Sequence, residues 1–217
     1  MAIGRELDLL AKYPKGKRDP AARALEKTPE DVAIARQFGR EFFDGERRHG
    51  YGGYSADPAR WREVVEDIEC HYEVHSFLDV GCGKGGLVHA MHKWGGPWAV
   101  CGMDISRYAI ECSHVQMRTR LIVGCATNIP WVDNTFDLVV SINTIHNLDR
   151  AGCIKALQEI ERVGRRAYVT VDTYRNEEER QRMYDWNLTA LTILHVDEWK
   201  ALFEEAGYTG DYGWWTP

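Results

Sequence analysis

Short apolar runs alternate with stripes of helical spacing along most of this chain. The runs predict buried strands, and between them apolar residues recur at i, i+3, i+4 and i+7, as on the buried face of a helix. Strands that alternate with helices form right-handed βαβ units in a mostly parallel sheet. Near-continuous apolar strands fit a sheet that helices cover on both faces. The expected strands span residues 76–80, 98–103, 121–123, 136–142, 167–171 and 208–215.

Capping residues and apolar stripes locate the expected helices. Thr28 and Pro29 begin one, and Asp31 adds an imperfect capping box. Residues 1 to about 27 are charged and weakly periodic, which predicts a mobile arm, and residues 49–54 predict a glycine-rich loop. Asp57-Pro58 starts a second helix, whose buried stripe is Trp61, Val64, Val65 and Ile68. Further helices are expected to start at about Lys84 and after the cap Ser106. The last three are expected around the stripe Ala156 to Val163, over Glu177 to Trp186, and around Trp199 to Ala206, where Gly207 ends the helix.

Length and charge limit the class of protein. The chain has 217 residues, which fits one domain with room for an N-terminal extension. Its formal net charge is −6, whereas a protein that grips a nucleic-acid backbone usually carries a basic stripe. The basic clusters Lys15-Gly16-Lys17-Arg18 and Arg47-Arg48 are short and indicate solvated surface or anion contacts. We therefore expect no nucleic-acid partner.

Cysteine usage and hydropathy favour a cytoplasmic protein without a bound metal. Six cysteines occur and no two form a C-x-x-C pair, which argues against a structural zinc site and for a reducing compartment. His89 and His92 lie about one helical turn apart, but no third ligand of matching spacing follows. No apolar run approaches the roughly 20 residues that span a bilayer. Acids stand where a signal peptide would carry positive charge. We expect no metal and no membrane partner.

A glycine-rich turn after the first strand carries the strongest functional signal. Gly81, Gly83 and Gly86 form G-x-G-x-x-G, a turn used by both S-adenosylmethionine and dinucleotide sites. Asp79 stands two residues before Gly81, where a carboxylate suits a cationic ligand and opposes a pyrophosphate. Asp104 ends the second strand, where an acid can hold ribose hydroxyls of either cofactor. About 130 residues follow the motif, which leaves little room for the second domain of many dehydrogenases.

Four segments in order resemble the class I S-adenosylmethionine-dependent methyltransferases, namely residues 78–83, 102–106, 124–130 and 133–137. The resemblance spans residues 75 to 210. It implies an α/β, Rossmann-like fold with a mostly parallel six- or seven-stranded sheet, helices on both faces and an N-terminal helical extension. The cofactor would lie at the carboxyl ends of the strands, in agreement with the switch-point rule for open α/β sheets. By position, the resemblance implies that the cofactor-binding residues are Asp79, Gly81, Cys82, Gly83, Asp104, Ile105, Ala126, Thr127 and Asn143.

One position departs from the pattern of these methyltransferases. Many of them carry Asp where this chain has Cys125, to accept from the adenine amino group, and a thiol accepts poorly. We expect adenine recognition to rest on backbone groups, with Asn128 as an alternative. The resemblance also implies an antiparallel strand pair at the end of the sheet. This chain shows one clear strand there, with residues 189–194 as the candidate for another.

Segments 38–45, 50–54 and 206–212 look like those of a subgroup of small bacterial methyltransferases. That resemblance suggests methyl transfer to oxygen or nitrogen of a small polar acceptor, such as a sugar or an acidic compound, with S-adenosylhomocysteine as second product. The expected organisation is an N-terminal helical extension and active-site lid over residues 1–60, followed by the methyltransferase domain over residues 61–217. A nicotinamide-dependent oxidoreductase and a non-catalytic S-adenosylmethionine-binding protein are the alternatives. The sequence leaves the oligomeric state open.

The loop after the fourth strand holds the catalytic candidate. In the class I fold this loop lies beside the transferred methyl group, and the imidazole of His146 titrates near neutral pH. We expect His146 to act as a general base or to orient the acceptor; the alternative is that it caps or packs against the next helix. Asn143 is a candidate contact for the amino end of the cofactor or a plain turn residue. Asn147 is a candidate substrate contact.

Further substrate candidates lie in two other loops. Tyr51 and Tyr54 stand among three glycines, either as a lid facing the sulfonium or as a turn packed on the core. Tyr174 and Arg175 follow the fifth strand, where an arginine can bind a carboxylate or phosphate. Structural roles are expected for Asn176 as a helix cap, for His195 as a cap or surface residue, and for Trp186 and Trp199 as core. Arg47 and Arg48 are expected to be solvated surface, with attraction of an acidic substrate as the alternative.

Overall fold

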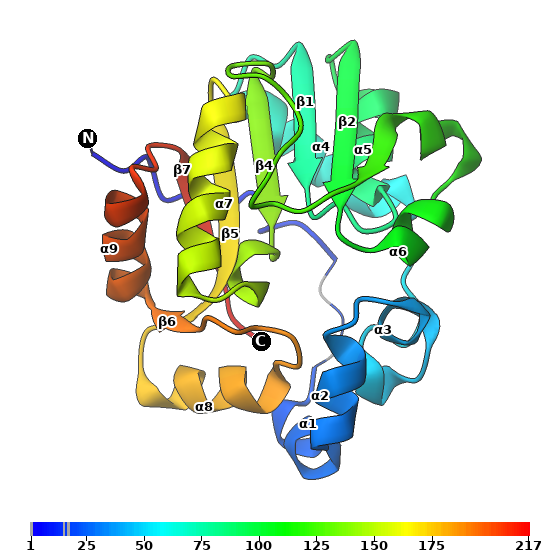
Figure 1. The fold of residues 1–217 in the computed structure, drawn as a ribbon, viewed down its shortest axis with the longest axis vertical. Helices are drawn as coiled ribbons and strands as arrows, with labels where there is room; N and C mark the ends of the chain where they lie inside the picture. The colour runs from blue at the N-terminus through cyan, green and yellow to red at the C-terminus, as the bar shows by residue number, and fades with distance from the viewer. Residues whose placement is uncertain (1, 15, 17) are drawn as a thin grey trace.

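The apolar runs form the strands of one parallel sheet (Figure 1). The computed structural model describes residues 2–14, 16 and 18–217. The strand order is β3-β2-β1-β4-β5-β6, with β7 also paired to β5, and every recorded pairing is parallel. The strands are β1 (Ser76–Val80), β2 (Ala99–Asp104), β3 (Leu121–Val123), β4 (Leu138–Ile142), β5 (Ala167–Tyr174), β6 (Leu194–His195) and β7 (Asp211–Trp215).

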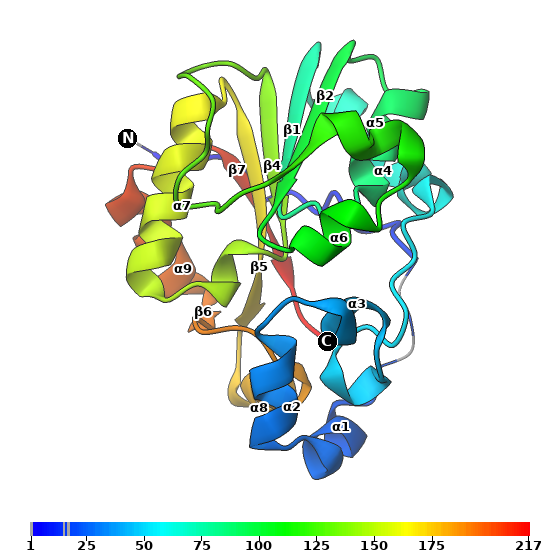
Figure 2. The ribbon, with the colours of Figure 1, turned by 45° about the vertical axis from the view of Figure 1, so that its right-hand side comes forward.

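Helices cover both faces of the sheet, and a separate group of helices lies below the carboxyl ends of the strands in Figures 1 and 2. That group contains α1 (Pro20–Glu26), α2 (Pro29–Ala35), α3 (Arg40–Asp44) and α8 (Glu177–Trp186). The others are α4 (Arg62–His71), α5 (Gly86–Trp94), α6 (Arg107–Glu111), α7 (Arg150–Val163) and α9 (Val196–Ala206), with short 3-10 turns at Arg47–His49, Pro58–Trp61, Val115–Arg120 and Ile145–Asn147. Among the described residues, no helix combines the length and apolar character needed to cross a membrane.

The sheet separates two hydrophobic cores because successive side chains of a strand point to opposite faces. Leu78 and Val139 pack on one face with residues of α7 and α9. Phe77 and Leu138 pack on the other face with residues of α4 and α5. The predicted Rossmann-like α/β fold with helices on both faces is therefore confirmed.

Most of the predicted helix signals are confirmed in detail. Thr28 and Asp31 form a complete reciprocal capping box at the start of α2. Ser106 caps α6 by accepting a hydrogen bond from the backbone of Ala109. Gly207 ends α9 in the left-handed conformation with a φ of +71°. Asn176 and His195 cap α8 and α9, as predicted.

The expectation of a mobile N-terminal arm is wrong for the described residues around position 6. The backbone N–H of Leu7 donates to the carbonyl of Tyr212 at 2.8 Å, so this segment runs alongside β7. The Arg5 guanidinium pairs with Asp211 at 2.7 Å, and Leu9 is buried. The arm is held because β7 offers an unpaired edge. Lys15 and Lys17 of the predicted basic cluster lie outside the described residues.

The end of the sheet differs from the implied antiparallel pair. β7 pairs with β5 in parallel, from Tyr168 opposite Asp211 to Asp172 opposite Trp215. Of the candidate strand at 189–194, only Leu194 joins a strand, the two-residue β6. A long helix, α9, returns the chain to the amino end of the sheet before β7 begins, which makes the last pairing parallel.

Candidate functional site

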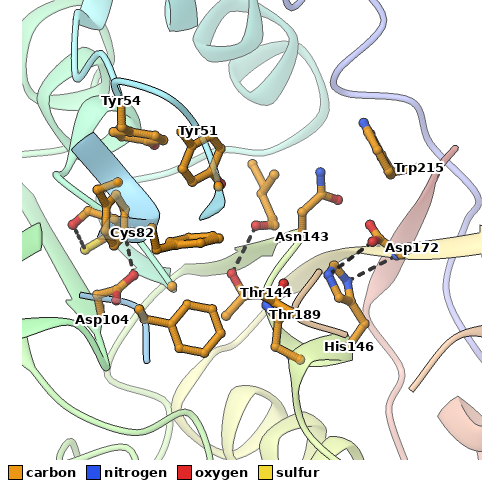
Figure 3. A pocket seen from close by; sticks show the side chains of 18 of the residues that line it. Tyr51, Tyr54, Cys82, Asp104, Asn143, Thr144, His146, Asp172, Thr189 and Trp215 are labelled. Carbon is orange, nitrogen blue, oxygen red and sulfur yellow. Dashed lines mark hydrogen bonds and ion pairs between the residues drawn. The ribbon is translucent and has the colours of Figure 1, made fainter. Parts of the chain in front are cut away.

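The carboxyl ends of the strands and the N-terminal helices enclose a cavity of about 600 Å³. Its lining joins the glycine turn after β1, the end of β2, the loop after β4 and the carboxyl end of β5 to residues 38–61. Figure 3 shows Cys82 and Asp104 at one end of this cavity and His146 and Asp172 at the other. The cavity therefore lies where the order of the strands reverses, at the edge predicted for the cofactor.

The glycine turn needs glycine for two reasons. Gly81 and Gly83 have φ angles of +86° and +54°, which side chains rarely adopt. A Cβ on Gly81 would overlap the hydroxyl of Thr144 and lie 2.6 Å from its Cβ. A Cβ on Gly83 would lie 3.3 Å from the hydroxyl of Tyr54. The bare backbone of the turn thus forms part of the cavity wall.

Two buried carboxyl groups stand at the ends of β1 and β2 beside this turn. Asp104 accepts hydrogen bonds from the backbone N–H of Gly83 at 2.7 Å and of Ser106 at 2.8 Å. Burial, followed by the nearby charge of Asp104, raises the pKa of Asp79 to about 8. Burial also raises the pKa of Asp104, although its two backbone hydrogen bonds act to lower it. A cationic ligand in contact with Asp79 would stabilise its charged form.

Two buried amide oxygens line the same cavity without a partner. The Oδ1 atoms of Asn143 and Asn147 make no hydrogen bond to any described residue. Most buried polar atoms in proteins have a hydrogen-bond partner, so these two oxygens are available to a ligand or an ordered water. Asn143 also has a φ of +51°, a strained conformation that is common at functional sites. These orphan oxygens, the bare glycine backbone and the acid Asp79 fit S-adenosylmethionine, which carries a cation and several polar groups.

Only some of the residues predicted to bind the adenine line the cavity. Ile105 and Ala126 line it, and the Ile105 side chain is 56% exposed there. Thr127 does not line the cavity, and its hydroxyl lies 3.1 Å from the thiol of Cys125. Adenine recognition through backbone groups therefore stays a prediction.

His146 forms a buried pair with Asp172, a residue of β5. Its Nδ1 accepts a hydrogen bond from the backbone N–H of Asp172 at 3.2 Å. Its Nε2 lies 3.4 Å from Asp172 Oδ2 (Figure 3). Because Nδ1 is an acceptor, the ring proton belongs on Nε2, facing the carboxylate. Burial lowers the pKa of His146 to about 3, so the imidazole is neutral at physiological pH.

Asp172 is the more basic member of this pair. Burial raises its pKa to about 8, whereas a hydrogen bond from Asn187 and the charge of Arg18 act in the opposite direction. Its Oδ2 accepts from the Asn187 amide and faces His146. An acid with a pKa near the working pH can take a proton from a substrate. Nδ1 of His146 accepts a hydrogen bond and Nε2 carries the ring proton, so its predicted role as a base has less support from these contacts than a role as an orienting partner.

Residues 38–54 close the cavity on the side away from the sheet. The rings of Tyr51 and Tyr54 lie 4.7 Å apart, and Tyr54 packs edge-on against Phe43 at 5.4 Å. Lys84, in the glycine turn, donates to Asp44 at the end of α3 at 2.6 Å. An ion pair therefore joins the N-terminal segment to the glycine turn. The two tyrosines thus lie on the cavity, as predicted, and their role as a lid stays a prediction.

Tyr174 and Arg175 are not brought to the cavity. β5 runs through Tyr174, three residues beyond its predicted end, and carries both side chains past the cavity. The Tyr174 ring packs against His195 at 5.6 Å, and Arg175 Nη1 lies 3.9 Å from Glu179. Their predicted contact with substrate has no support in this arrangement.

Several cavity residues were missed from the sequence, namely Arg18, Arg23, Asp172 and Trp215. An acid at the end of an apolar strand was the available signal for Asp172. Arg18 belongs to a basic cluster for which anion contacts were one expectation, whereas Arg23 gave no signal, because its place depends on how the N-terminal helices dock. One structural prediction is wrong, because Trp186 lines the cavity instead of the core. Arg47 is exposed, as predicted, and it also lines the cavity. The core role of Trp199 is confirmed, since this side chain is fully buried.

Comparison with known proteins agrees with the geometry. Residues 77–167 match the family model of a methyltransferase domain. Norajmaline N-methyltransferase of Rauvolfia serpentina is 30% identical over 111 residues, which are 46% of this chain and 37% of that protein. A protein of Encephalitozoon cuniculi described as a methyltransferase is 30% identical over 128 residues, 57% of this chain and 51% of its own length. The chain thus spans about half or less of these relatives.

Solved structures share the fold at lower identity. A Haloferax volcanii methyltransferase complex with the Trm112 activator superposes with a TM-score of 0.53 at 19% identity, over 69% of this chain and 73% of that chain. YcgJ of Bacillus subtilis gives 0.52 at 20% identity, over 65% and 64%. The [4+2]-cyclase SpnF gives 0.53 at 20% identity, over 68% and 56%. Residues 77–167 thus match the model of a methyltransferase domain, and the fold of the chain agrees with that match.

Proposed function

We propose that this chain transfers a methyl group from S-adenosylmethionine to an oxygen or nitrogen atom of a small polar acceptor. One observation carries the proposal: a single cavity joins the glycine turn and its two acids to the Asp172–His146 pair. The first end suits a cationic cofactor, and the second end offers a proton acceptor for an incoming nucleophile. S-adenosylhomocysteine would be the second product.

On the cofactor side, Asp79 and Asn143 would bind the amino acid end of S-adenosylmethionine. The backbone of residues 81–83 would approach it closely because no Cβ intervenes at either glycine. Asp104 keeps lone pairs for ribose hydroxyls, since each of its oxygens accepts only one recorded hydrogen bond. The bound cofactor supplies an already activated methyl group, so the protein mainly has to place the acceptor and exclude water.

On the acceptor side, we propose Asp172 as the general base and His146 as the residue that positions it. A hydroxyl acceptor must lose its proton as the new bond forms, and that proton would pass to the carboxylate of Asp172. His146 Nε2 and the Asn187 amide hold this carboxylate from one side. An amine that arrives neutral would need positioning only, and Asp172 would then orient it.

The N-terminal segment is proposed as the cover of this reaction chamber. Tyr51 and Tyr54 present aromatic rings to the cavity, and aromatic faces favour a nearby cation such as a sulfonium. The Lys84–Asp44 ion pair would keep the cover attached to the glycine turn. Residues 1–60 would then act as a lid and residues 61–217 as the methyltransferase domain. We also propose a cytoplasmic location, since all six cysteines are free thiols.

The alternatives are separated by which ligand binds. A nicotinamide-dependent oxidoreductase would place a pyrophosphate at the glycine turn, where the buried Asp79 would oppose it. The fold alone does not decide the reaction, and SpnF shows that a [4+2]-cyclase can have this fold. A protein that binds S-adenosylmethionine without catalysis would have the same cavity.

The first test is calorimetric titration with S-adenosylhomocysteine, with NAD and NADP as parallel ligands. We expect micromolar binding of S-adenosylhomocysteine, about −8 kcal/mol, and no dinucleotide signal. Transfer of labelled methyl groups to a panel of sugars, organic acids and amines then tests catalysis. Dinucleotide binding would overturn the proposal, and cofactor binding without transfer to any acceptor would favour the non-catalytic alternative.

A further inference from the structure

Three arginine side chains converge on one tryptophan at the acceptor end of the cavity. The guanidinium carbon of Arg23 lies 4.5 Å from the ring centre of Trp186, that of Arg47 lies 5.2 Å away, and that of Arg18 lies 5.9 Å away. Arg18 also lies 4.9 Å from the ring of Trp215. All of these side chains line the cavity. They come from both termini and from α8, so only the folded chain brings them together.

These three cations have no carboxylate partner among the described residues. Arg23 and Arg47 both donate to the carbonyl of Gly50, which carries no net charge. The Nε of Arg23 is buried and makes no hydrogen bond to any described residue. Burial, followed by the charge of Arg47, lowers the pKa of Arg23 to about 10. The cluster therefore holds like charges together at a cost that a bound anion would remove.

The neighbouring Arg48 shows the contrasting arrangement. Its Nε lies 3.1 Å from Glu46 and 3.7 Å from Asp31, and it does not line the cavity. The chain thus supplies acids to the arginine that faces away from the cavity and none to those that face it. Simple stacking on Trp186 accounts for an arginine beside the ring. It does not account for three of them with no counter-charge.

The cavity acid whose charge acts on this cluster is Asp172, which already has two partners. Its Oδ2 is held by Asn187 and faces His146, and its charge acts on Arg18 without a recorded salt bridge. A ligand that spans this end would therefore meet a proton acceptor on one side and guanidinium groups on the other. Guanidinium groups bind phosphate and carboxylate oxygens in paired hydrogen bonds.

We propose that Arg18, Arg23 and Arg47 form an oxyanion subsite, so the methyl acceptor carries a phosphate or carboxylate group. This inference rests on the proposed methyl transfer and names the class of acceptor for it. The anionic group would sit over Trp186, and the atom to be methylated would lie toward Asp172 and the glycine turn. A neutral sugar or amine without such a group would bind poorly.

The test uses the whole protein saturated with S-adenosylhomocysteine and two probes, inorganic phosphate and sodium acetate. Binding is followed by calorimetry and by tryptophan fluorescence, because Trp186 and Trp215 both contact the cluster. We expect saturable binding of phosphate, of acetate or of both, at millimolar concentration. The stronger probe indicates whether the acceptor group is a phosphate or a carboxylate.

Arg47→Gln and Arg23→Gln should weaken probe binding by about tenfold or more, and the affinity for S-adenosylhomocysteine should not change. Arg47 is exposed on one side, so Arg47→Gln serves if Arg23→Gln disturbs the packing of α1 on α8. Arg48→Gln is the matched control, with the same change of charge outside the cavity.

No saturable binding of either probe, or equal weakening by Arg48→Gln, would overturn the subsite. Failure of the unmodified protein to bind S-adenosylhomocysteine would instead overturn the proposed function, so the two failures are distinguishable.

Discussion

The two ends of the cavity are built in different ways. The cofactor half, defined here as Asp79, Gly81, Gly83 and Asp104, lies at the ends of two adjacent strands, β1 and β2. The acceptor half is assembled from distant parts of the chain: Arg18, Arg23, Arg47, His146, Asp172, Trp186 and Trp215. The first depends on backbone conformation within a short segment. The second depends on helices that dock from both ends of the chain.

This difference separates what the chain shares with relatives from what is its own. The family match over residues 77–167 includes the whole cofactor half. Of the acceptor half it includes only His146, and it ends five residues before Asp172. The shared part therefore indicates the cofactor, and the part outside the match has to indicate the acceptor. Substitutions in each half should affect different measurements.

Gly81→Ala should have a large effect and act on the cofactor half alone. The new Cβ would overlap Thr144, at a φ of +86° that strains any side chain. A clash and strain of about 3 kcal/mol predict roughly 100-fold weaker binding of S-adenosylhomocysteine by calorimetry. Gly39→Ala is the control, because nothing lies within 4 Å of its Cβ position and its φ is −88°. Unchanged affinity in Gly81→Ala would place the cofactor elsewhere.

Asp172→Asn should act on the acceptor half alone. Removal of the proton acceptor predicts a fall in kcat of about 100-fold or more for a hydroxyl acceptor. Binding of S-adenosylhomocysteine should be unchanged. His146→Gln should lower kcat by about tenfold, because the carboxylate would lose its orienting partner. A larger loss in His146→Gln than in Asp172→Asn would restore His146 as the base.

The pH dependence of kcat/KM for the acceptor separates these two assignments further. Burial raises the pKa of Asp172 to about 8. The titratable and polar groups that face Asp172 are Arg18, His146, Tyr51 and Asn187. A carboxyl group is protonated below its pKa and then cannot accept a proton. The rate at saturating S-adenosylmethionine should therefore rise about tenfold per pH unit below 8 and level off above it. With His146 as the base, at a pKa of about 3, the rate would be flat from pH 5 to 9.

Lys84→Met tests the connection between the glycine turn and the N-terminal segment. Lys84 is nearly buried and donates to Asp44 at 2.6 Å. Loss of this ion pair should lower the free energy of unfolding by about 2 kcal/mol, measured in urea. Lys12→Met is the matched control, since Lys12 pairs with Asp67 at 2.7 Å on an exposed side chain and should change little. Equal effects would mean that the segment is held by its aromatic contacts instead.

The cofactor half could be predicted from sequence because its signal is local. Glycines at fixed spacing after an apolar strand, with Asp79 before them and Asp104 at the next strand end, indicate the turn and its charge. The strands of a mostly parallel sheet and both helical layers followed from the periodicity of the apolar residues. The parallel β7 could not be predicted, because its direction depends on how α9 returns the chain and on the N-terminal residues that pair beside it.

The acceptor half could not be predicted, because its residues have other common roles. Arg47 has the sequence context of a surface residue, and Trp186 that of a core residue. Arg23 reaches Trp186 because α1 and α8 lie side by side, which no periodicity indicates. Asp172 was overlooked although the predicted strand 167–171 ends directly before it; the substrate prediction fell on Tyr174 and Arg175 of the same segment.

Arg175→Gln should have the smallest effect of these changes. The Arg175 side chain is 48% exposed and pairs only loosely with Glu179 at 3.9 Å, away from the cavity lining. An exposed pair contributes little to stability or binding, so KM for the acceptor and affinity for S-adenosylhomocysteine should both stay unchanged. Arg47→Gln removes the same charge at the cavity and should raise KM for an anionic acceptor. If Arg175→Gln raised KM instead, the acceptor would extend past the end of β5. The sequence prediction for Arg175 would then be right, and the acceptor half would have to include Arg175 and its loop.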